Sequence, residues 1–406
     1  MATPSKKLSR GITNGYLSAR GLAAGLAMVF ALVYSTNLGV ERRSLVAFIM
    51  ATAMVVAVIL TSGVSLVFRR SVPTAENKIT LNSYLYLTTF LSVFVSGFTL
   101  LFVLIYSHTK TEIPTTLLLI TIIYAFFASL DFCFHQALIA YSLFKVAAIL
   151  DVLTISIQIS IYLMLFLVNQ VSIAVSLFTA LIISYLTSTT AALLLLIGIK
   201  DSSIRFSTSE IQHLIAQSKN YHLFGIANGF ADRIDRIIIA WFLPLGVLGK
   251  YAVSTSLISF LRFLPEAMSR LIVSGNSIPV ITKFSKNRIS QIATFAVSAL
   301  IGSLLSQLFV NLFFGAAWKL PILVLLLFAI QEIARGYYQI VISRLIAKGS
   351  ERDVRNLSIT LILFSSALPI LGVNLIGIYG VPLGIGLSYV FLSAYLKTSQ
   401  SKTAQR

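Results

Sequence analysis

Apolar residues follow one another in long runs along almost the whole chain, and polar residues gather in the short intervals between them. A helix that crosses the hydrocarbon core of a bilayer needs about 20 mainly apolar residues. Runs of this length predict twelve membrane-spanning helices, near residues 15–36, 44–68, 82–106, 113–138, 143–168, 171–198, 218–243, 249–273, 290–315, 319–344, 357–376 and 379–396. No interval is long enough for a soluble domain. The pattern predicts an all-α integral membrane protein.

The longest polar interval covers residues 200–217 and divides the predicted spans into six and six. Within it, apolar residues recur on one helical face at Ile211, Leu214 and Ile215. This pattern predicts an amphipathic connection on the cytoplasmic membrane surface. We therefore expect two six-helix bundles, residues 1–199 and 218–406, around a central cavity, which is a common plan in transporters.

The composition supports a membrane protein and argues against a water-soluble globular enzyme. Hydrophobic residues make up 57% of the chain and charged residues only 11%, whereas about a quarter of the residues in soluble domains are charged. Because Cys133 is the single cysteine, no intrachain disulfide can form. Motifs for nucleotide hydrolysis, zinc proteolysis and serine hydrolysis are absent from the sequence. We expect no catalytic residue, no metal site and no cofactor.

The formal net charge of +18 arises from 31 Lys and Arg against 13 Asp and Glu. If the N-terminus is cytoplasmic, 20 basic residues lie in the predicted cytoplasmic segments and 5 in the outer loops, namely Arg42, Arg43, Lys110, Lys250 and Lys319. Basic residues concentrate on the cytoplasmic side of membrane proteins. The bias predicts that both termini are cytoplasmic, and it explains most of the charge without a nucleic-acid partner.

The other six basic residues lie within the predicted spans and are all arginines: Arg20, Arg233, Arg236, Arg262, Arg270 and Arg335. A charge inside the bilayer costs several kcal/mol unless it faces a watery cavity or a partner. Guanidinium stays ionised when buried and binds phosphate or carboxylate with a planar fork. The pattern favours an anionic ligand, and the predicted substrate-binding residues are Arg20, Arg233, Arg236, Arg262 and Arg335.

Acidic residues within the spans offer a second interpretation, in which these charges form structural ion pairs or couple transport to an ion. The residues concerned are Asp131, Asp151, Asp232, Asp235, Glu266 and Glu332, together with Arg270. Helical spacing would pair Asp232 with Arg236, Arg262 with Glu266, and Glu332 with Arg335. Arg20 has no such neighbour within its own span, so it is the best single candidate for ligand contact. His135, four residues after Asp131, is either a proton relay or an ordinary hydrogen-bonded residue. Pro265 is expected to kink the eighth span.

The stretch from Gly225 to Leu261, GIANGFADRIDRIIIAWFLPLGVLGKYAVSTSLISFL, resembles the seventh and eighth helices of O-antigen-type polysaccharide flippases. That family belongs to the multidrug/oligosaccharidyl-lipid/polysaccharide exporter (MOP) superfamily. Its pattern is an Asp-Arg pair, an apolar run and a Leu-Gly-x-Tyr-x-x-Ala turn. Here the pair is Asp232-Arg233 or Asp235-Arg236, and the turn is residues 248–254, with Ser254 as the last small residue.

The resemblance implies a flippase that moves a polyprenyl-pyrophosphate-linked oligosaccharide from the cytoplasmic to the outer leaflet by alternating access. The cargo would be an O-antigen (lipopolysaccharide), capsule or exopolysaccharide repeat unit. The implied location is the bacterial inner membrane. Expected partners are the lipid-linked oligosaccharide, membrane lipids, and a polymerase or other polysaccharide-assembly protein, with the chain itself a monomer.

Two other classes compete with the flippase. A cation-coupled multidrug exporter of the same superfamily would use buried carboxylates such as Asp131, Asp151 or Asp232, and should have a cavity dominated by acids. A membrane-embedded polymerase usually carries a large outer loop, which this sequence lacks. The arginine-rich set favours the flippase.

Overall fold

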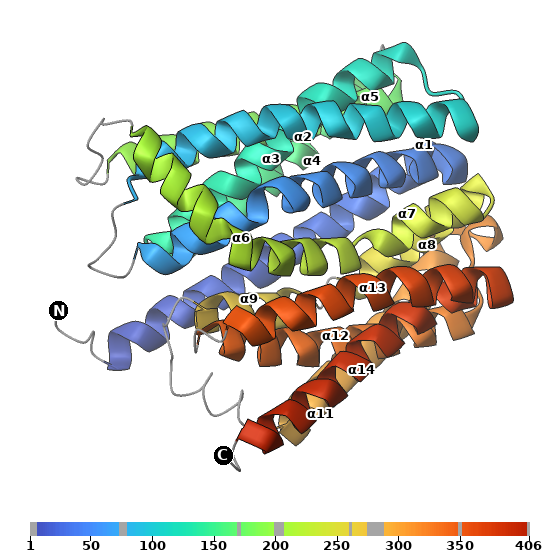
Figure 1. Ribbon diagram of the computed structural model, residues 1–406. Helices are drawn as coiled ribbons and strands as arrows, with labels where there is room; N and C mark the ends of the chain where they lie inside the picture. Colours follow the sequence, from blue (N-terminus) through green and yellow to red (C-terminus); the bar gives the residue numbers. More distant parts are fainter. Residues whose placement is uncertain are drawn as a thin grey trace. The chain divides into compact units, whose positions relative to one another are not determined.

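The computed structural model describes residues 6–72, 79–168, 172–198, 207–259, 262–273, 288–347 and 351–403, which are almost entirely helical (Figure 1). Residues 169–170, which separate two predicted spans, and residues 200–206 of the predicted connection lie outside the described residues. The chain divides into two compact units. The N-terminal unit comprises Met1–Leu38 and Phe48–Gly229, and the C-terminal unit comprises Gly39–Ala47 and Phe230–Arg406.

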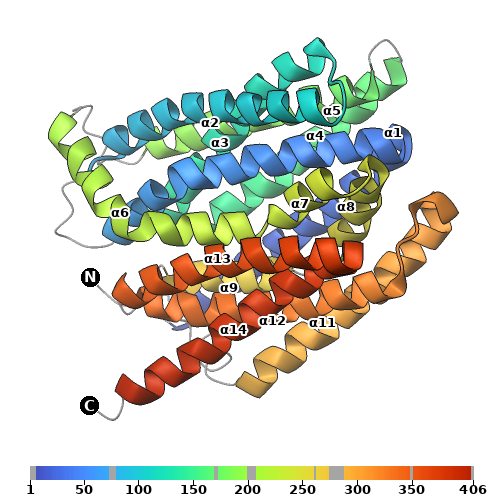
Figure 2. The same ribbon diagram turned by 45° about the vertical axis from the view of Figure 1, so that its right-hand side comes forward.

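Most of α1 and all of the next four helices form the N-terminal unit, with most of α6. The helices are α1 (Lys6–Ser71), α2 (Leu81–Thr109), α3 (Thr115–Ala140), α4 (Phe144–Val168), α5 (Ile173–Ile197) and α6 (Thr208–Ala231). Helix α3 packs against α2 and α5, and α4 packs against α5 (Figures 1 and 2). A break at Gly39, where φ is 74°, divides α1 into two helical stretches that match the first two predicted spans.

Helix α12 is the centre of the C-terminal unit, where it contacts α9, α11 and α14. The main helices are α7 (Ile234–Phe242), α8 (Leu245–Ser259), α9 (Phe263–Val273), α11 (Arg288–Phe309), α12 (Ile322–Ala347), α13 (Glu351–Ile376) and α14 (Gly380–Thr403). Helices α13 and α14 pack along each other, and both contact α7 (Figure 2). The α12 side chains are therefore available to several neighbours at once.

Among the described residues, eight helices are long and apolar enough to cross a membrane, or nine if the bent α8–α9 pair is one span. The chain is therefore a multi-pass membrane protein, but the predicted count of twelve is not confirmed. Two of the eight segments are much longer than one bilayer crossing. Gly15–Ser71 has 57 residues and contains the Gly39 break, and Val354–Tyr395 has 42 residues and includes parts of both α13 and α14.

Helix α2 illustrates how the spans face lipid. Its buried face carries small polar side chains, namely Ser83, Thr88, Ser92, Ser96 and Thr99. Its exposed face carries large apolar ones, namely Phe90, Phe94, Phe98, Leu101 and Phe102. The Ser92 hydroxyl lies 3.0 Å from that of Ser129 on α3. Small residues and hydroxyl contacts between helices, with apolar residues outside, are typical of packing within a membrane.

Two predicted spans are broken in the structure. The span predicted at 218–243 is the second half of α6 followed by α7, with a turn at Asp232 and Arg233 between them. The span predicted at 249–273 is α8 and α9, which meet at 61°. The bend in this span lies just before Pro265, which is in the first turn of α9. A proline in a first turn removes no intrahelical hydrogen bond, so α9 itself is not kinked by it.

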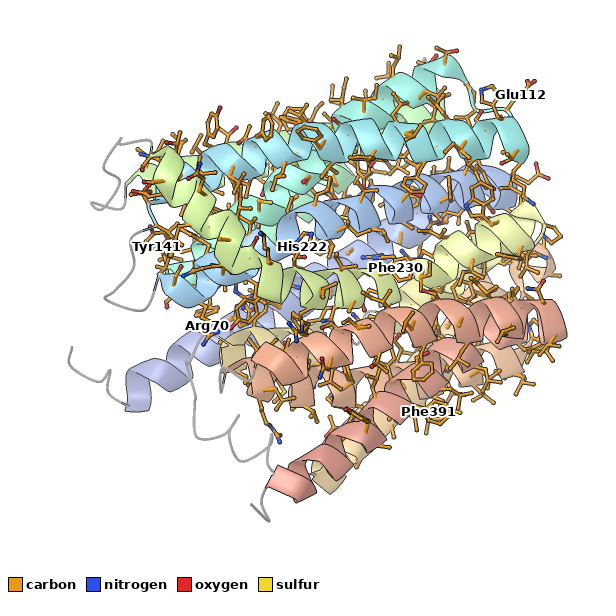
Figure 3. The ribbon with its side chains drawn as sticks, viewed as in Figure 1. Arg70, Glu112, Tyr141, His222, Phe230 and Phe391 are labelled. Carbon is orange, nitrogen blue, oxygen red and sulfur yellow. The ribbon has the colours of Figure 1, made fainter. Side chains whose placement is uncertain are left out.

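Glycines allow α6 to lie close against the second stretch of α1. A Cβ atom on Gly225 would collide with the Ser62 side chain, and one on Gly229 would collide with Val58. A Cβ atom on Gly63 of α1 would lie 2.7 Å from Nδ1 of His222, a residue labelled on α6 in Figure 3. The contact extends to Tyr221, whose ring centroid lies 5.4 Å from the Arg70 guanidinium. Small residues permit such close approach of helices in membranes.

The first turn of α6 is attached to the N-terminus of α2 by Glu210. Its carboxylate accepts hydrogen bonds from the Thr80 backbone N–H at 3.1 Å, the Thr80 hydroxyl at 2.7 Å and the Ser83 hydroxyl at 2.8 Å. Burial raises the pKa of Glu210, but these three hydrogen bonds outweigh it and leave the pKa below the ordinary value. Thr80 is also the N-cap of α2, so Glu210 stabilises the start of that helix.

Glu210→Gln is expected to accelerate hydrogen exchange of the first-turn amides of α2 without lowering the global melting temperature. The wild-type protection should be present above the ordinary pKa of a glutamate and be lost as the pH falls through the lowered folded-state value. Hydrogen-exchange mass spectrometry at several pH values measures both effects. The Ser209→Ala variant, one residue away, is the control. Equal exchange in Glu210→Gln and the wild type at neutral pH would contradict this role.

Candidate functional site

A chain of four charged groups runs through the N-terminal unit. Arg20 of α1 donates a hydrogen bond from Nη1 to Oδ2 of Asp151 on α4. The other oxygen of Asp151 lies 3.3 Å from Nε2 of His135 on α3. His135 Nδ1 lies 3.4 Å from Oδ1 of Asp131 and 3.0 Å from the carbonyl oxygen of the same residue. His135 therefore lies between two carboxylates, and Arg20 offsets the charge of one of them.

The partner of Arg20 comes from a part of the sequence 131 residues away. The absence of a partner at helical spacing made Arg20 the best predicted ligand contact, but the structure provides a carboxylate from another helix. Spacing within one helix cannot reveal such a pair. A histidine between two carboxylates suits a proton relay as well as a structural bridge, so both predicted roles of His135 stay predictions.

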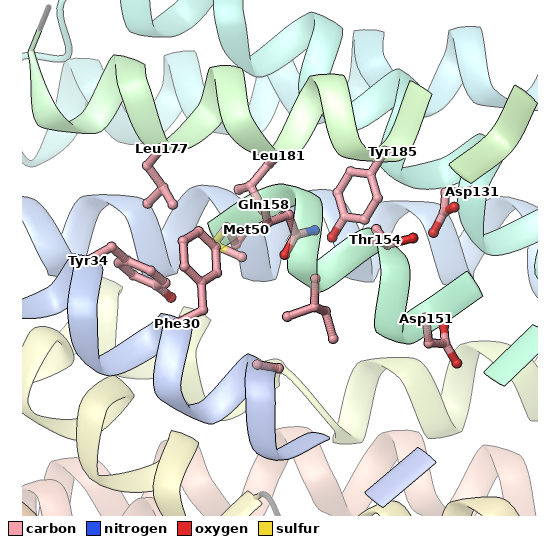
Figure 4. Close-up of a pocket in the computed structure, with 12 residues that line it drawn as sticks. Phe30, Tyr34, Met50, Asp131, Asp151, Thr154, Gln158, Leu177, Leu181 and Tyr185 are labelled. Carbon is pink, nitrogen blue, oxygen red and sulfur yellow. The ribbon is translucent and has the colours of Figure 1, made fainter. Parts of the chain in front are cut away.

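Beside these groups the N-terminal unit contains a partly open cavity of about 310 Å³ (Figure 4). It is lined by α1, α3, α4 and α5. Its polar lining residues are Tyr34, Asp131, Asp151, Thr154, Gln158 and Tyr185. Its apolar lining residues are Ala27, Phe30, Met50, Ile155, Leu177 and Leu181. The cavity thus combines ionisable groups, an amide, hydroxyls and aromatic rings.

The C-terminal unit holds a second cluster, centred on Arg335 of α12, which is 2% exposed. Its guanidinium donates to both oxygens of Asp232, at 2.6 and 2.7 Å. It also lies 3.3 Å from Glu266 and 3.4 Å from Glu332. The bidentate contact with Asp232 is the strong geometry for a guanidinium and a carboxylate. Arg335 thus connects α12, α9 and the turn between α6 and α7.

Arg262, immediately before α9, is paired as well. It donates to both oxygens of Glu332, with the Nε bond at 2.5 Å, and its guanidinium lies 5.4 Å from the Phe328 ring centroid. Of the three ion pairs predicted from helical spacing, the structure contains one among its described residues, Glu332–Arg335. The helix breaks separate Asp232 from Arg236 and Arg262 from Glu266. Asp232 and Glu266 both contact Arg335 instead.

Arg233 and Arg236, at the break between α6 and α7, differ from the paired arginines. Neither guanidinium forms an ion pair with the residues that the structure describes, and Arg236 Nε is buried without a hydrogen-bond partner. Asp235, which lies beside them, accepts from the Tyr251 hydroxyl at 3.0 Å and from the Arg236 backbone N–H at 2.8 Å. Two arginines at this break are therefore not neutralised by direct carboxylate contact.

Arg43 is a charged residue whose burial the sequence did not predict. We expected it in an outer loop, but it is 4% exposed and belongs to the C-terminal unit, where its charge acts on Arg236. No periodicity near residue 43 distinguishes it from a loop arginine. In the sequence, Tyr251 stood out only as the tyrosine of the Leu-Gly-x-Tyr turn. In the structure its hydroxyl donates to Asp235. The remaining predicted residue, Arg270, lies in the last turn of α9, one turn after Glu266.

The structure thus brings Arg233, Arg236, Arg262 and Arg335 into the C-terminal unit and Arg20 into the N-terminal unit. A single central cavity shared by all five stays a prediction. Among the described residues, no group of three or more His, Cys, Asp or Glu side chains could hold a metal ion.

The fold matches solved structures of membrane transporters along their full length. A MOP superfamily transporter from Pyrococcus furiosus is 12% identical, with a TM-score of 0.73 and 99% of each chain covered. A mutant of the Vibrio cholerae MATE transporter VcmN is 13% identical, with a TM-score of 0.69 and coverage of 98% of this chain and 97% of that one. An outward-facing multidrug resistance MATE family transporter is 13% identical, with a TM-score of 0.67 and coverage of 100% and 99%.

No protein-family model and no curated protein matches the sequence. At 12–13% identity, the structural likeness establishes the fold, which is that of MATE transporters of the MOP superfamily. This is the fold expected from the superfamily that the Gly225–Leu261 motif implies. Several functions share this fold, so the fold alone does not assign the family.

Proposed function

We propose that the chain is a flippase that carries a polyprenyl-pyrophosphate-linked oligosaccharide across the bacterial inner membrane by alternating access. The observation that carries this proposal is the presence of Arg233 and Arg236 at a helix break, within the membrane protein's charged cluster and without carboxylate partners among the described residues. Buried charges without a partner mark substrate pathways in membrane proteins. A pyrophosphate would supply the missing negative charge.

The surroundings of the two arginines support an anion. Asp235 attracts the charge of Arg236, whereas Arg262 and Arg43 repel it, and a bound anion would relieve that repulsion. The break also gives α7 its own N-terminus, whose backbone dipole favours negative charge. Transporters often use the N-terminal ends of broken helices to hold anionic groups of the substrate. Phosphate oxygens match the planar donors of guanidinium.

The likeness to the Pyrococcus furiosus transporter is compatible with this proposal. That MOP superfamily transporter is described as having a binding pocket of reverse polarity, which suggests a different function for it. We extend the idea to the C-terminal unit of this chain, whose predicted spans contain five arginines (Arg233, Arg236, Arg262, Arg270 and Arg335) against four acids (Asp232, Asp235, Glu266 and Glu332). In our proposal both termini are cytoplasmic, and a polymerase or another polysaccharide-assembly protein receives the product.

A cation-coupled multidrug exporter is the second candidate, and the cavity lined by Asp131 and Asp151 favours it. Two carboxylates near one cavity could attract a cation. However, Arg20 contacts Asp151, and His135 contacts both acids, so the negative charge is already partly offset. The charge balance therefore favours the flippase.

Complementation of a bacterium that lacks its own O-antigen flippase tests the proposal. We expect the wild-type chain to restore surface polysaccharide when the host makes a matching repeat unit, which requires a panel of hosts with different repeats. Immunoblotting with repeat-specific antisera measures the product, and membrane fractionation checks the protein level. Export of cationic dyes by the purified protein in proteoliposomes, without transfer of any lipid-linked oligosaccharide, would favour the multidrug exporter and contradict the flippase.

A further inference from the structure

We infer that the cavity of the N-terminal unit is a recognition site for one pyranose ring of the transported glycan. This inference rests on the proposed function and adds to it the residues that would contact the sugar: Gln158, Tyr34, Asp131 and Asp151. The cavity would provide the sugar specificity of the proposed flippase.

Gln158 is the observation that points to a ligand. It lines the cavity and is only 6% exposed, and its amide makes no hydrogen bond with the residues that the structure describes (Figure 4). Its amide atoms are not among the fully buried polar atoms of the described residues, so they are accessible from the cavity, where a ligand can bond them. An amide both donates and accepts, so it fits a ligand with hydroxyl groups, which also do both.

The charges around the cavity favour a neutral ligand. Asp151 is engaged by Arg20 and His135, and Asp131 by His135, so a cation would have to compete with groups already present. An anion would face two carboxylates. Asp131 Oδ1 is fully buried beside His135, so only the remaining part of the Asp131 carboxylate can face the cavity. Hydrogen bonds to carboxylates are stronger than neutral ones, so that part suits a ligand hydroxyl.

Aromatic side chains supply the second half of a sugar site. Phe30, Tyr34 and Tyr185 line the cavity, and Phe30 is held edge-to-face by Tyr34 at 5.1 Å and by Tyr162 at 5.7 Å between ring centroids. A pyranose ring has apolar C–H faces and hydroxyl groups around its edge. Rings that present a flat apolar face beside polar groups match both parts of such a ligand.

The volume limits the ligand to a small one. Small-molecule sites typically measure about 300–1,000 Å³, and this cavity of about 310 Å³ lies at the lower end. Its volume suits a single ring, and its open side lets the rest of a glycan extend outward. Because the lining includes two carboxylates and an amide, a lipid tail would leave these polar groups without partners.

Saturation-transfer difference NMR on the purified full-length protein in detergent tests this site. The probes are methyl glycosides of glucose, galactose, N-acetylglucosamine, N-acetylgalactosamine, mannose and rhamnose. We expect at least one to bind, and Gln158→Leu to weaken its binding at least about 10-fold, because lost hydrogen bonds to a ligand hydroxyl reduce affinity strongly. Ala27→Leu, which reduces the cavity volume, should have a similar effect. Gln331→Leu is the matched control, since Gln331 is 2% exposed in the other unit.

The outcomes separate this site from the proposed function. If wild type complements the flippase-deficient host while no glycoside binds, or while Gln158→Leu and Ala27→Leu both bind like wild type, the sugar site is wrong and the flippase stands. If a glycoside binds and both variants abolish binding, but wild type transfers no lipid-linked oligosaccharide, the site stands and the flippase proposal is wrong. Equal weakening by Gln331→Leu would mean that the loss is not specific to the cavity, and would overturn the assignment.

Discussion

Replacing Arg335 by methionine is expected to lower the free energy of unfolding by about 3–5 kcal/mol. The guanidinium contacts Asp232, Glu266 and Glu332, and its removal leaves three carboxylates near one another with fewer cations to offset them. Methionine preserves much of the side-chain volume, so the loss reports mainly on charge. Denaturant titration of the protein in mixed micelles, followed by tryptophan fluorescence, measures the change.

A combined variant provides the control for this prediction. Asp232→Asn and Glu266→Gln should recover much of the stability lost in Arg335→Met, since both substitutions remove charges that have become unpaired. The interaction free energy between the sites follows from the double-mutant cycle. A loss below about 1 kcal/mol in Arg335→Met, or no recovery in the combined variant, would show that the cluster does not hold α12, α9 and the α6–α7 turn together.

The positions of most helices could be predicted from the sequence. The span predicted at 82–106 is α2, Leu81–Thr109, and that predicted at 143–168 is α4, Phe144–Val168. This agreement has a simple origin, because the bilayer requires long uninterrupted apolar runs and leaves polar residues to the joints. The superfamily fold was predicted through the Gly225–Leu261 motif, which lies across the two spans that turned out to be broken.

The partners of the buried charges could not be predicted, because most of these ion pairs join residues on different helices. Nothing in the spacing of residues along one helix brings Arg20 to Asp151, or Arg262 to Glu332. The break after α6 redirects Asp232 from the neighbouring Arg236 to Arg335 of α12. The sequence identified the charged residues, whereas the packing of the helices determines which arginines contact a carboxylate among the described residues.

The double substitution Arg233→Gln with Arg236→Gln is expected to reduce transport by about 100-fold without reducing stability. Charge-assisted hydrogen bonds contribute about 1.5–3 kcal/mol each, and the loss of one from each arginine to the pyrophosphate corresponds to at least about 100-fold. Stability should stay equal or rise, because Arg236 Nε is buried without a partner, burial disfavours both charges, and repulsion by Arg262 opposes their attraction to Asp235. Transfer of a fluorescent lipid-linked oligosaccharide in proteoliposomes measures the rate, and thermal unfolding measures the stability.

Arg262→Gln is the matched control, since its charge is paired with Glu332. It should lower the melting temperature, because removing one member of a buried pair leaves the other charge uncompensated. The two variants thus distinguish an arginine that stabilises the fold from arginines proposed to bind an anion. Selection for binding can preserve charges that destabilise the ligand-free protein, so replacing them can raise its stability while it abolishes function. Normal transport by the double variant at wild-type protein levels would exclude Arg233 and Arg236 from the anion site, whatever its effect on stability.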